Sequence, residues 1–225
     1  MTRLAIFDCD GTLVDSGHSI HLALGETFVR HGRPVPPRSE SQRVIGLSLD
    51  EAFAVLAPDA SPADQRSFSA TYREVFAALR ARGAVDEPLF DGIRPLLDAL
   101  EEDGWLLAVA TGKSDRGLQH CLAVNGLAGR FVSLQTADRH LSKPHPSMAL
   151  EAMLDAGAEP ADTVVIGDAG WDMGMAKAAG ATPIGALWGY HDAAELRLAG
   201  ADALVDAPAA VLAAVRRLFG EVEHG

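Results

Sequence analysis

The sequence predicts an α/β protein whose doubly wound, parallel, Rossmann-like sheet is interrupted early by an all-helical insertion. From residue 87 onward, short apolar runs alternate with segments that carry apolar residues at helical spacing, and this alternation is typical of a parallel sheet. Residues 16–86 show helical spacing only. The apolar runs are nearly continuous, which indicates strands covered on both faces. We therefore predict a core domain formed by residues 1–15 and 87–225, and a helical domain formed by residues 16–86.

The first predicted strand covers residues 4–7 and leads into an acidic loop. Because side chains alternate along a strand, Asp8 and Asp10 leave its end on the same side. Two neighbouring carboxylates repel each other, and they stay together if they share a cation or if one keeps its proton. Gly11 and Thr12 offer backbone N–H groups in a tight turn that suits an anion. One loop therefore supplies a nucleophile, an acid, a cation site and an anion site.

Three helices are predicted within the insertion. The first covers residues 17–31 and ends at a stretch rich in glycine and proline, and a short one follows over residues 49–57. The third begins at Ser61, because a serine cap followed by proline and then by an acid is a strong helix start. Its apolar residues form one stripe between Phe68 and Leu79.

The remainder of the core alternates between strands and helices. Strands are predicted over residues 105–110, 131–134, 163–166, 182–187 and 203–205. Helices are predicted from Asp91 to Gly104, from Ser114 to Gly126, over residues 146–157, through Met173 and Ala176, and over residues 208–219.

Five polar residues stand at or beyond the carboxyl ends of these strands. They are Asp8, Asp10, Thr111 and Asp168 at strand ends, and Lys143 in the loop after the third strand. Ligands bind at that edge of parallel sheets. We therefore expect the five side chains to converge on one site.

The composition narrows the class of protein. The 225 residues are 48% hydrophobic and carry a formal net charge of −12, which argues against nucleic acid as a partner because phosphate backbones require a basic face. A metal ion and one lysine can still reverse the local sign for a small phosphorylated substrate. With no signal peptide and no apolar run long enough for a bilayer, we expect a cytoplasmic protein with no membrane partner. Cys9 and Cys121 lack metal-ligand spacing and are expected to be reduced core residues.

Four short motifs make the chain resemble the haloacid dehalogenase-like (HAD) phosphohydrolase superfamily, and especially its phosphoglycolate phosphatase branch. In chain order they are Asp8-Cys9-Asp10-Gly11-Thr12, Thr111-Gly112, Lys143-Pro144, and Gly167-Asp168 with Asp172. The insertion at residues 16–86 is similar to the first type of cap in that superfamily. Cys9 departs from the Phe or Leu that is usual there, and its side chain is expected to point away from the two aspartates.

The resemblance implies a Mg²⁺-dependent phosphatase that acts on a small phosphorylated metabolite. Asp8 is then the nucleophile that forms an aspartyl-phosphate, and Asp10 protonates the leaving oxygen and later activates the water. Thr111 binds phosphoryl oxygens and Lys143 neutralises the developing charge. Asp172 is expected to orient Lys143 or a metal-bound water.

The resemblance also implies which groups bind the metal and the phosphoryl oxygens. Mg²⁺ is expected on the carboxylates of Asp8 and Asp168 and on the backbone carbonyl of Asp10, because few protein oxygens plus water suit this ion. The phosphoryl oxygens are expected to bind backbone N–H groups near Gly11, Thr12 and Gly112.

Outside the motifs, Arg43 lies where this type of cap places a substrate-reading loop, so we expect it to bind substrate, whereas Lys113 is expected to be solvated. A phosphonate hydrolase of this group needs a lysine in the cap, but the lysines of this chain are Lys113, Lys143 and Lys177. A dehalogenase normally lacks the second aspartate of the loop, so the presence of Asp10 argues against that activity. A β-phosphoglucomutase-like phosphotransferase and an inorganic pyrophosphatase remain open, and so, more remotely, does a non-catalytic binding protein on the same fold. The chain is expected to be a monomer or a homodimer.

Overall fold

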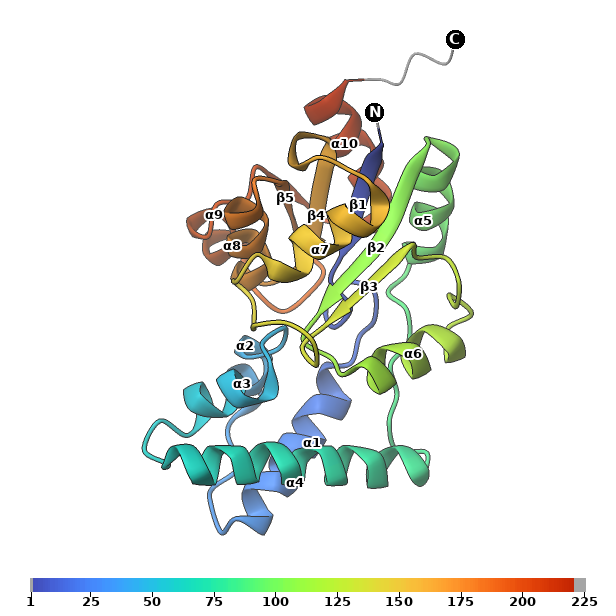
Figure 1. Cartoon of the computed structure of the whole chain (residues 1–225). Coiled ribbons are helices and arrows are strands. Elements are labelled where there is room, and N and C mark those ends of the chain that lie inside the picture. Colours follow the sequence, from blue (N-terminus) through green and yellow to red (C-terminus); the bar gives the residue numbers. More distant parts are fainter. Residues whose placement is uncertain (1, 221–225) are drawn as a thin grey trace.

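The computed structural model describes residues 2–220, and its core is one six-stranded parallel sheet (Figure 1). The strands lie in the order β3-β2-β1-β4-β5-β6. They are β1 (Arg3–Phe7), β2 (Trp105–Thr111), β3 (Ser133–Thr136), β4 (Thr163–Gly167), β5 (Thr182–Ala186) and β6 (Ala203–Val205). All neighbouring strands are parallel, so their carboxyl ends meet at one edge. The predicted doubly wound α/β core is confirmed.

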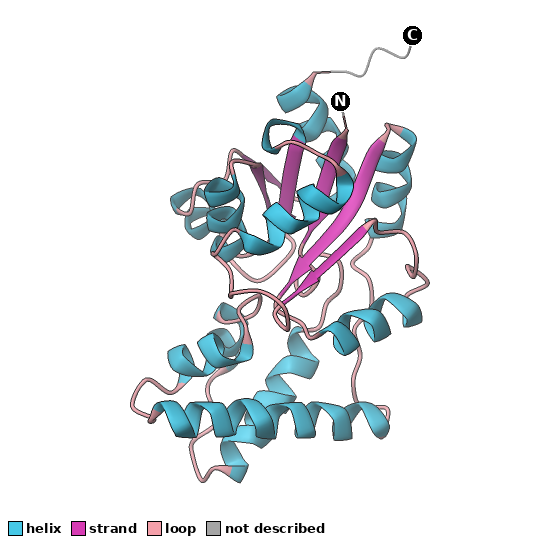
Figure 2. Cartoon of the chain, in the orientation of Figure 1, coloured by secondary structure: helices cyan, strands magenta, loops and turns pink. Residues whose placement is uncertain are grey.

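Helices cover both faces of the sheet, as Figure 2 shows. On one face, α5 (Ile93–Glu102), α6 (Asp115–Val124) and α10 (Val211–Phe219) pack with Phe7 and Val109 into one apolar cluster. On the other face, α7 (Ser147–Ala156) and α8 (Gly170–Ala179) pack with Ile6 and Ala108. Because alternate residues of β1 and β2 belong to opposite clusters, both faces of the sheet are buried under apolar side chains. This burial explains the continuous apolar runs of the strands.

The insertion forms a separate helical layer beyond the carboxyl ends of the strands (Figure 1). It contains α1 (Gly17–Arg30), α2 (Arg38–Arg43), α3 (Leu49–Leu56) and α4 (Pro62–Ala81). Its own apolar cluster includes Leu24, Phe28, Phe53, Phe68 and Val75. The Ser61 side chain caps α4 by accepting from the Asp64 N–H. We call α1–α4 and the loops between them the helical layer.

Two connections join the helical layer to the core, one just before α1 and one between α4 and α5. The boundaries predicted near residues 15 and 87 fall in these connections, and the division into two domains stays a prediction. The strand order changes direction at β1, because β2 and β3 lie on one side of it and β4 to β6 lie on the other. The gap between the ends of β1 and β4 is therefore the point where ligands bind in such sheets.

Three elements differ from the sequence-based expectation. The short helices α2 and α9 (Ala193–Leu198) were not predicted, because six residues are too few for an apolar stripe to show. The third strand begins at Ser133 rather than at residue 131. Phe131 instead packs against the core cluster from the preceding loop, so its apolar character reflects burial and not pairing.

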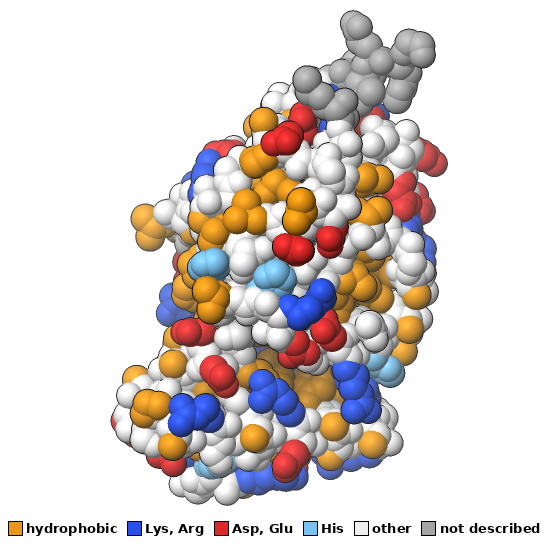
Figure 3. All heavy atoms as spheres, in the orientation of Figure 1, with side chains coloured by type: hydrophobic (Ala, Val, Ile, Leu, Met, Phe, Trp, Pro, Cys, Tyr) orange, Lys and Arg blue, Asp and Glu red, His pale blue; other side chains and the backbone are white. Residues whose placement is uncertain are grey.

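On the face of the molecule shown in Figure 3, Lys and Arg side chains are interspersed with Asp and Glu, and no continuous basic surface forms there. This arrangement agrees with the net charge of −12. Within residues 2–220, the helices are too short or too polar for any of them to cross a bilayer.

Candidate active site

The loop after β1 folds tightly onto Asp168, the residue that follows β4. The backbone of Gly11 has a φ of +86°, and a Cβ there would overlap the Asp168 carboxylate, so glycine is required. Thr12 Oγ1 donates to Asp168 Oδ1 at 2.8 Å, and the Tyr190 N–H donates to Oδ2 at 2.9 Å. These contacts hold the carboxylate beside Asp8, across the gap between β1 and β4.

Asp8, Lys143, Asp168 and Asp172 form a buried group that we call the nucleophile cluster. Lys143 Nζ lies 2.9 Å from Asp8 Oδ1 and 2.6 Å from Asp172 Oδ1, and the exposed fraction of its side chain is 0%. One carboxylate oxygen from each of the three aspartates lies within 4.8 Å of the others. One buried lysine therefore faces three buried carboxylates.

Burial and mutual repulsion shift the titration of this cluster. Burial, together with the charges of Asp172 and Asp168, holds the pKa of Asp8 well above its ordinary value although Lys143 opposes the shift. Burial and then Asp172 raise the pKa of Asp168 to about 7. Burial alone would lower the pKa of Lys143, but Asp172 and Asp8 outweigh it and raise that pKa. The positive charge of Lys143 is therefore too small to balance the three carboxylates around it.

The nucleophile cluster fits a hard divalent cation. Its ligands are oxygens only, which suits Mg²⁺. Three buried carboxylates share a single lysine there, and a cation would relieve their mutual repulsion. Asp172 already holds Lys143 through one oxygen and accepts the Ala169 N–H at 3.1 Å through the other, which is the contact that its predicted role as a partner of Lys143 requires.

The second aspartate of the loop lies in a different group, Asp10 with Ser16, Lys113 and Glu87, which we call the acid cluster. Asp10 Oδ1 accepts the Ser16 hydroxyl and lies 2.8 Å from Lys113 Nζ. Lys113 Nζ also lies 2.6 Å from Glu87 Oε1. Only 9% of the Lys113 side chain is exposed, so the expectation that it is solvated was wrong. The residue follows Gly112 at the edge of the sheet, and Glu87 compensates its charge there.

Thr111 and Gly112 lie at the end of β2, in contact with the helical layer. Thr111 is buried, and its Oγ1 accepts the Lys113 N–H at 3.2 Å. A Cβ on Gly112 would overlap the carbonyl of Leu47. A Cβ on Gly46 would lie 3.7 Å from Asp8 Oδ2. The loop between α2 and α3 therefore covers Asp8, and Oδ2 is the oxygen of Asp8 that faces it.

Arg43, the predicted substrate-reading residue, makes a contact that the sequence did not indicate. Its guanidinium lies 2.7 Å from Glu195 on α9, and 69% of its side chain is exposed. Its carbonyl accepts the Trp171 indole N–H at 3.4 Å. Arg43 thus joins the helical layer to the core, and its part in binding substrate stays a prediction.

Cys9 lies in the apolar core, on the side of the loop away from the carboxylates of the nucleophile cluster. Its Sγ is 3.9 Å from Cys121 Sγ, and both residues are buried. The contact with Cys121 and burial raise the pKa of the Cys9 thiol. The thiol therefore stays protonated, which is the state of an unreactive core residue.

Sequence reasoning missed three residues that contact the predicted ones. Ser16, Glu87 and Tyr190 hold Asp10, Lys113 and Asp168, respectively. Ser16 follows the motif that begins at Asp8, so its position was a usable signal. Glu87 and Tyr190 lie in irregular segments, where no period indicates which way a side chain points.

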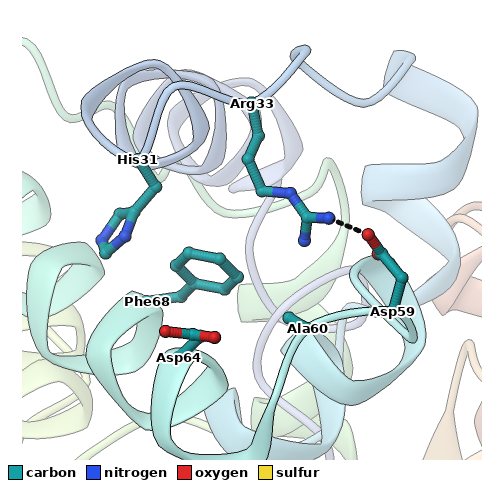
Figure 4. A pocket seen from close by; sticks show the side chains of 6 residues that line it. All are labelled: His31, Arg33, Asp59, Ala60, Asp64 and Phe68. Carbon is teal, nitrogen blue, oxygen red and sulfur yellow. Dashed lines mark hydrogen bonds and ion pairs between the residues drawn. The ribbon is translucent and has the colours of Figure 1, made fainter.

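The hollow drawn in Figure 4 belongs to the helical layer and not to this site. Arg33 pairs with Asp59 there, and its guanidinium lies 5.8 Å from the ring centre of Phe68. The lining residues come from α4 and from the loops that follow α1 and precede α4, so they include no group from the strand ends.

Comparison with known proteins agrees with this geometry. Residues 5–186 match the family model described as haloacid dehalogenase-like hydrolase. The chain is 35% identical over 222 residues to a protein of Dickeya dadantii named "Probable phosphatase IndB", covering 97% of this chain and 96% of that one. It is 31% identical over 208 residues to a phosphoglycolate phosphatase of Xylella fastidiosa, covering 92% and 90%. A crystal structure of a hydrolase from Pseudomonas syringae superposes with a TM-score of 0.84 at 26% identity, covering 96% of this chain and 99% of that one.

Proposed function

Because the chain belongs to the haloacid dehalogenase-like hydrolase family and is a phosphatase of that family, we propose that it hydrolyses a small phosphorylated metabolite with Mg²⁺ through an aspartyl-phosphate. The observation that carries the proposal is the environment of Asp8. One oxygen of its carboxylate is fixed by Lys143, and the other, Oδ2, is buried, unpartnered and turned toward the loop that covers the site. That oxygen is free to attack a phosphorus atom.

In the first half-reaction, an electron pair of Asp8 Oδ2 forms the new P–O bond while the bond from phosphorus to the ester oxygen breaks. The leaving oxygen keeps that electron pair and takes a proton from Asp10. Lys143 and the Thr111 hydroxyl stabilise the charge on the phosphoryl oxygens. Asp172 holds Lys143 in place at 2.6 Å.

In the second half-reaction, Asp10 takes a proton from water, and the water oxygen attacks the phosphorus of the intermediate. The bond between phosphorus and Asp8 breaks, phosphate leaves and the carboxylate is restored. Asp8, Asp168 and the backbone carbonyl of Asp10 would hold Mg²⁺, which neutralises phosphoryl oxygens when it is bound. Phosphate-ester hydrolysis is slow enough in water that all these contributions are needed.

The relative named phosphoglycolate phosphatase supports phosphoglycolate or a similarly small ester as the substrate. The covering loop supports small size as well, because Gly46 lies directly above Asp8. Glycine leaves room there for a short leaving group.

A substrate panel with and without Mg²⁺ tests the proposal. Phosphate release is measured from phosphoglycolate, β-glucose 1-phosphate and pyrophosphate, with a chelator as the metal control. We expect release that depends on Mg²⁺ and is highest with phosphoglycolate. Conversion of β-glucose 1-phosphate to its 6-phosphate would instead indicate a mutase, and no phosphate from any compound would contradict the proposal.

A further inference from the structure

Lys113 is a buried cation that the mechanism above does not use. It follows β2 and extends to Asp10, where its Nζ lies 2.8 Å from Oδ1. Glu87, in the connection between α4 and α5, holds the same Nζ at 2.6 Å and is itself buried. The other oxygen of Glu87 lies 3.5 Å from Arg80 on α4, and the Glu87 carbonyl accepts the Asn125 side chain at 3.0 Å. Lys113 is thus held by Asp10 and Glu87, and Glu87 is itself held by Arg80 and Asn125.

Stability alone does not explain this arrangement. A buried ion pair often contributes less to stability than apolar side chains of similar size, because both charges lose their hydration. Lysine is also among the residues that are least often buried. The position next to Asp10 therefore calls for a role that an apolar side chain could not fill.

The contacts of Asp10 indicate that role. Its Oδ1 accepts two donors, the hydroxyl of Ser16 and the ammonium of Lys113. A carboxyl oxygen with both lone pairs engaged in this way does not carry the acid proton. When Asp10 is protonated, the proton is therefore on Oδ2, and the two donors fix the plane of the carboxyl group.

We propose that Lys113, held by Glu87, is a positioning residue that orients the Asp10 carboxyl group so that Oδ2 delivers its proton to the leaving oxygen. The inference rests on the proposed function, because it assumes that Asp10 is the acid. Lys113 acts through Asp10 and needs no contact with the substrate. Its loss should therefore slow departure of the leaving group and leave substrate binding nearly unchanged.

The test compares two esters in the variant Lys113→Met. An alkyl phosphate such as phosphoglycolate has a poor leaving group and requires the acid, whereas p-nitrophenyl phosphate has a good one and does not. The quantity to compare is kcat/KM, because it ends at formation of the aspartyl-phosphate and excludes its hydrolysis, which is common to both esters. We expect kcat/KM for the alkyl ester to fall about 30-fold or more, because a positioned acid contributes roughly 10²–10⁴-fold, and kcat/KM for the nitrophenyl ester to change by less than about 3-fold.

Two further variants separate this effect from damage to the fold. The double variant Lys113→Met with Glu87→Leu removes the lysine together with the carboxylate that the single variant leaves without it, and we expect the same difference between esters. Lys177→Met is the matched control, because Lys177 pairs with Asp202 on the surface, and both esters should react as in the wild type.

The outcomes distinguish the inference from the proposed function. Equal losses on both esters would mean that Lys113 has only a structural role, and no loss on either would mean that Asp10 needs no orientation. Both results overturn the inference. If the wild-type protein hydrolyses neither ester, the proposed function itself has failed.

Discussion

The nucleophile cluster and the acid cluster share one plan but differ in charge. In each, a lysine stands between an aspartate of the loop after β1 and a second acid, at 2.9 and 2.6 Å for Lys143 and at 2.8 and 2.6 Å for Lys113. The nucleophile cluster sets three carboxylates against one lysine. The acid cluster sets two carboxylates against Lys113 and the nearby Arg80.

This difference shows which cluster is incomplete in the protein alone. The acid cluster balances its own charges, and both of its carboxylates pair with Lys113. The nucleophile cluster has excess negative charge and an unpartnered carboxylate oxygen, Asp8 Oδ2. A cation or a proton must make up the deficit, so the metal is expected at Asp8 and Asp168, and the Asp10 carboxylate is left free for proton transfer.

The largest expected effect comes from substitutions of the two loop aspartates. Asp8→Asn should lower turnover by about 10⁴-fold or more, because an amide does not attack phosphorus. Without metal the same variant should unfold at a higher temperature than the wild type, because it removes one of three crowded carboxylates.

Asp10→Asn should instead unfold at a lower temperature, because Lys113 and Arg80 then face Glu87 alone. Phosphate release and thermal unfolding in a chelator measure both effects. A gain in stability from Asp10→Asn would contradict the charge comparison.

A second prediction concerns pH and metal. Burial and Asp172 raise the pKa of Asp168 from 3.8 to about 7. A carboxyl group with a raised pKa favours folding while it is protonated, so in the metal-free protein its contribution is complete below about pH 4 and is lost as the pH rises through about 7. A bound cation replaces the proton, so Mg²⁺ should raise the unfolding temperature by a few degrees more at about pH 8 than at about pH 5.

Thermal unfolding at both pH values, with Mg²⁺ and with chelator, measures this difference. Asp168→Asn is the matched control and should remove most of it. An equal rise with Mg²⁺ at the two pH values would show that protonation and metal do not compete at Asp168.

The sequence predicted the nucleophile cluster better than the acid cluster, for a physical reason. Asp8 and Asp168 stand at the ends of strands, and the apolar runs that define those strands also define where the ends meet. Lys113 stands at such an end too, but whether its side chain is solvated or buried depends on Glu87. Glu87 lies in an irregular connection, and its path depends on how α4 packs, which no local pattern encodes.

The fold shows the same limit. Five of the six strands were predictable in place because each is an apolar run, whereas the third, Ser-Leu-Gln-Thr, was predicted two residues early because apolar Phe131 and Val132 precede it. Helix α9 had a local signal, since Asp192 accepts the N–H groups of Ala194 and Glu195 as an N-cap, but six residues give no stripe. Helix α2 is Arg-Ser-Glu-Ser-Gln-Arg and had none.

A smaller effect is expected from the second donor of the acid cluster. Ser16→Ala removes the hydroxyl on Asp10 Oδ1 and leaves Lys113 in place, so kcat/KM for an alkyl phosphate should fall about 3–10-fold, which corresponds to one hydrogen bond, with a smaller change for p-nitrophenyl phosphate. Ser19→Ala is the matched control, because Ser19 lies in α1, three residues after Ser16, and bonds the backbone of Asp86 instead. It should affect alkyl and nitrophenyl esters alike. If Ser16→Ala also affected both esters alike, Ser16 would have only a structural role.

The smallest effect is expected where the helical layer meets the core at the surface. The pair of Arg43 and Glu195 is 2.7 Å long, but 69% and 32% of the two side chains are exposed, and such pairs contribute about 0–1 kcal/mol. If the pair only joins the two regions, Arg43→Ala and Glu195→Ala should change kcat/KM by the same factor, less than about 5-fold. If Arg43 reads the substrate, Arg43→Ala should cost about 10-fold or more while Glu195→Ala costs little. Equal small effects would remove Arg43 from the substrate site and place specificity in the loop around Gly46, which lies closer to Asp8.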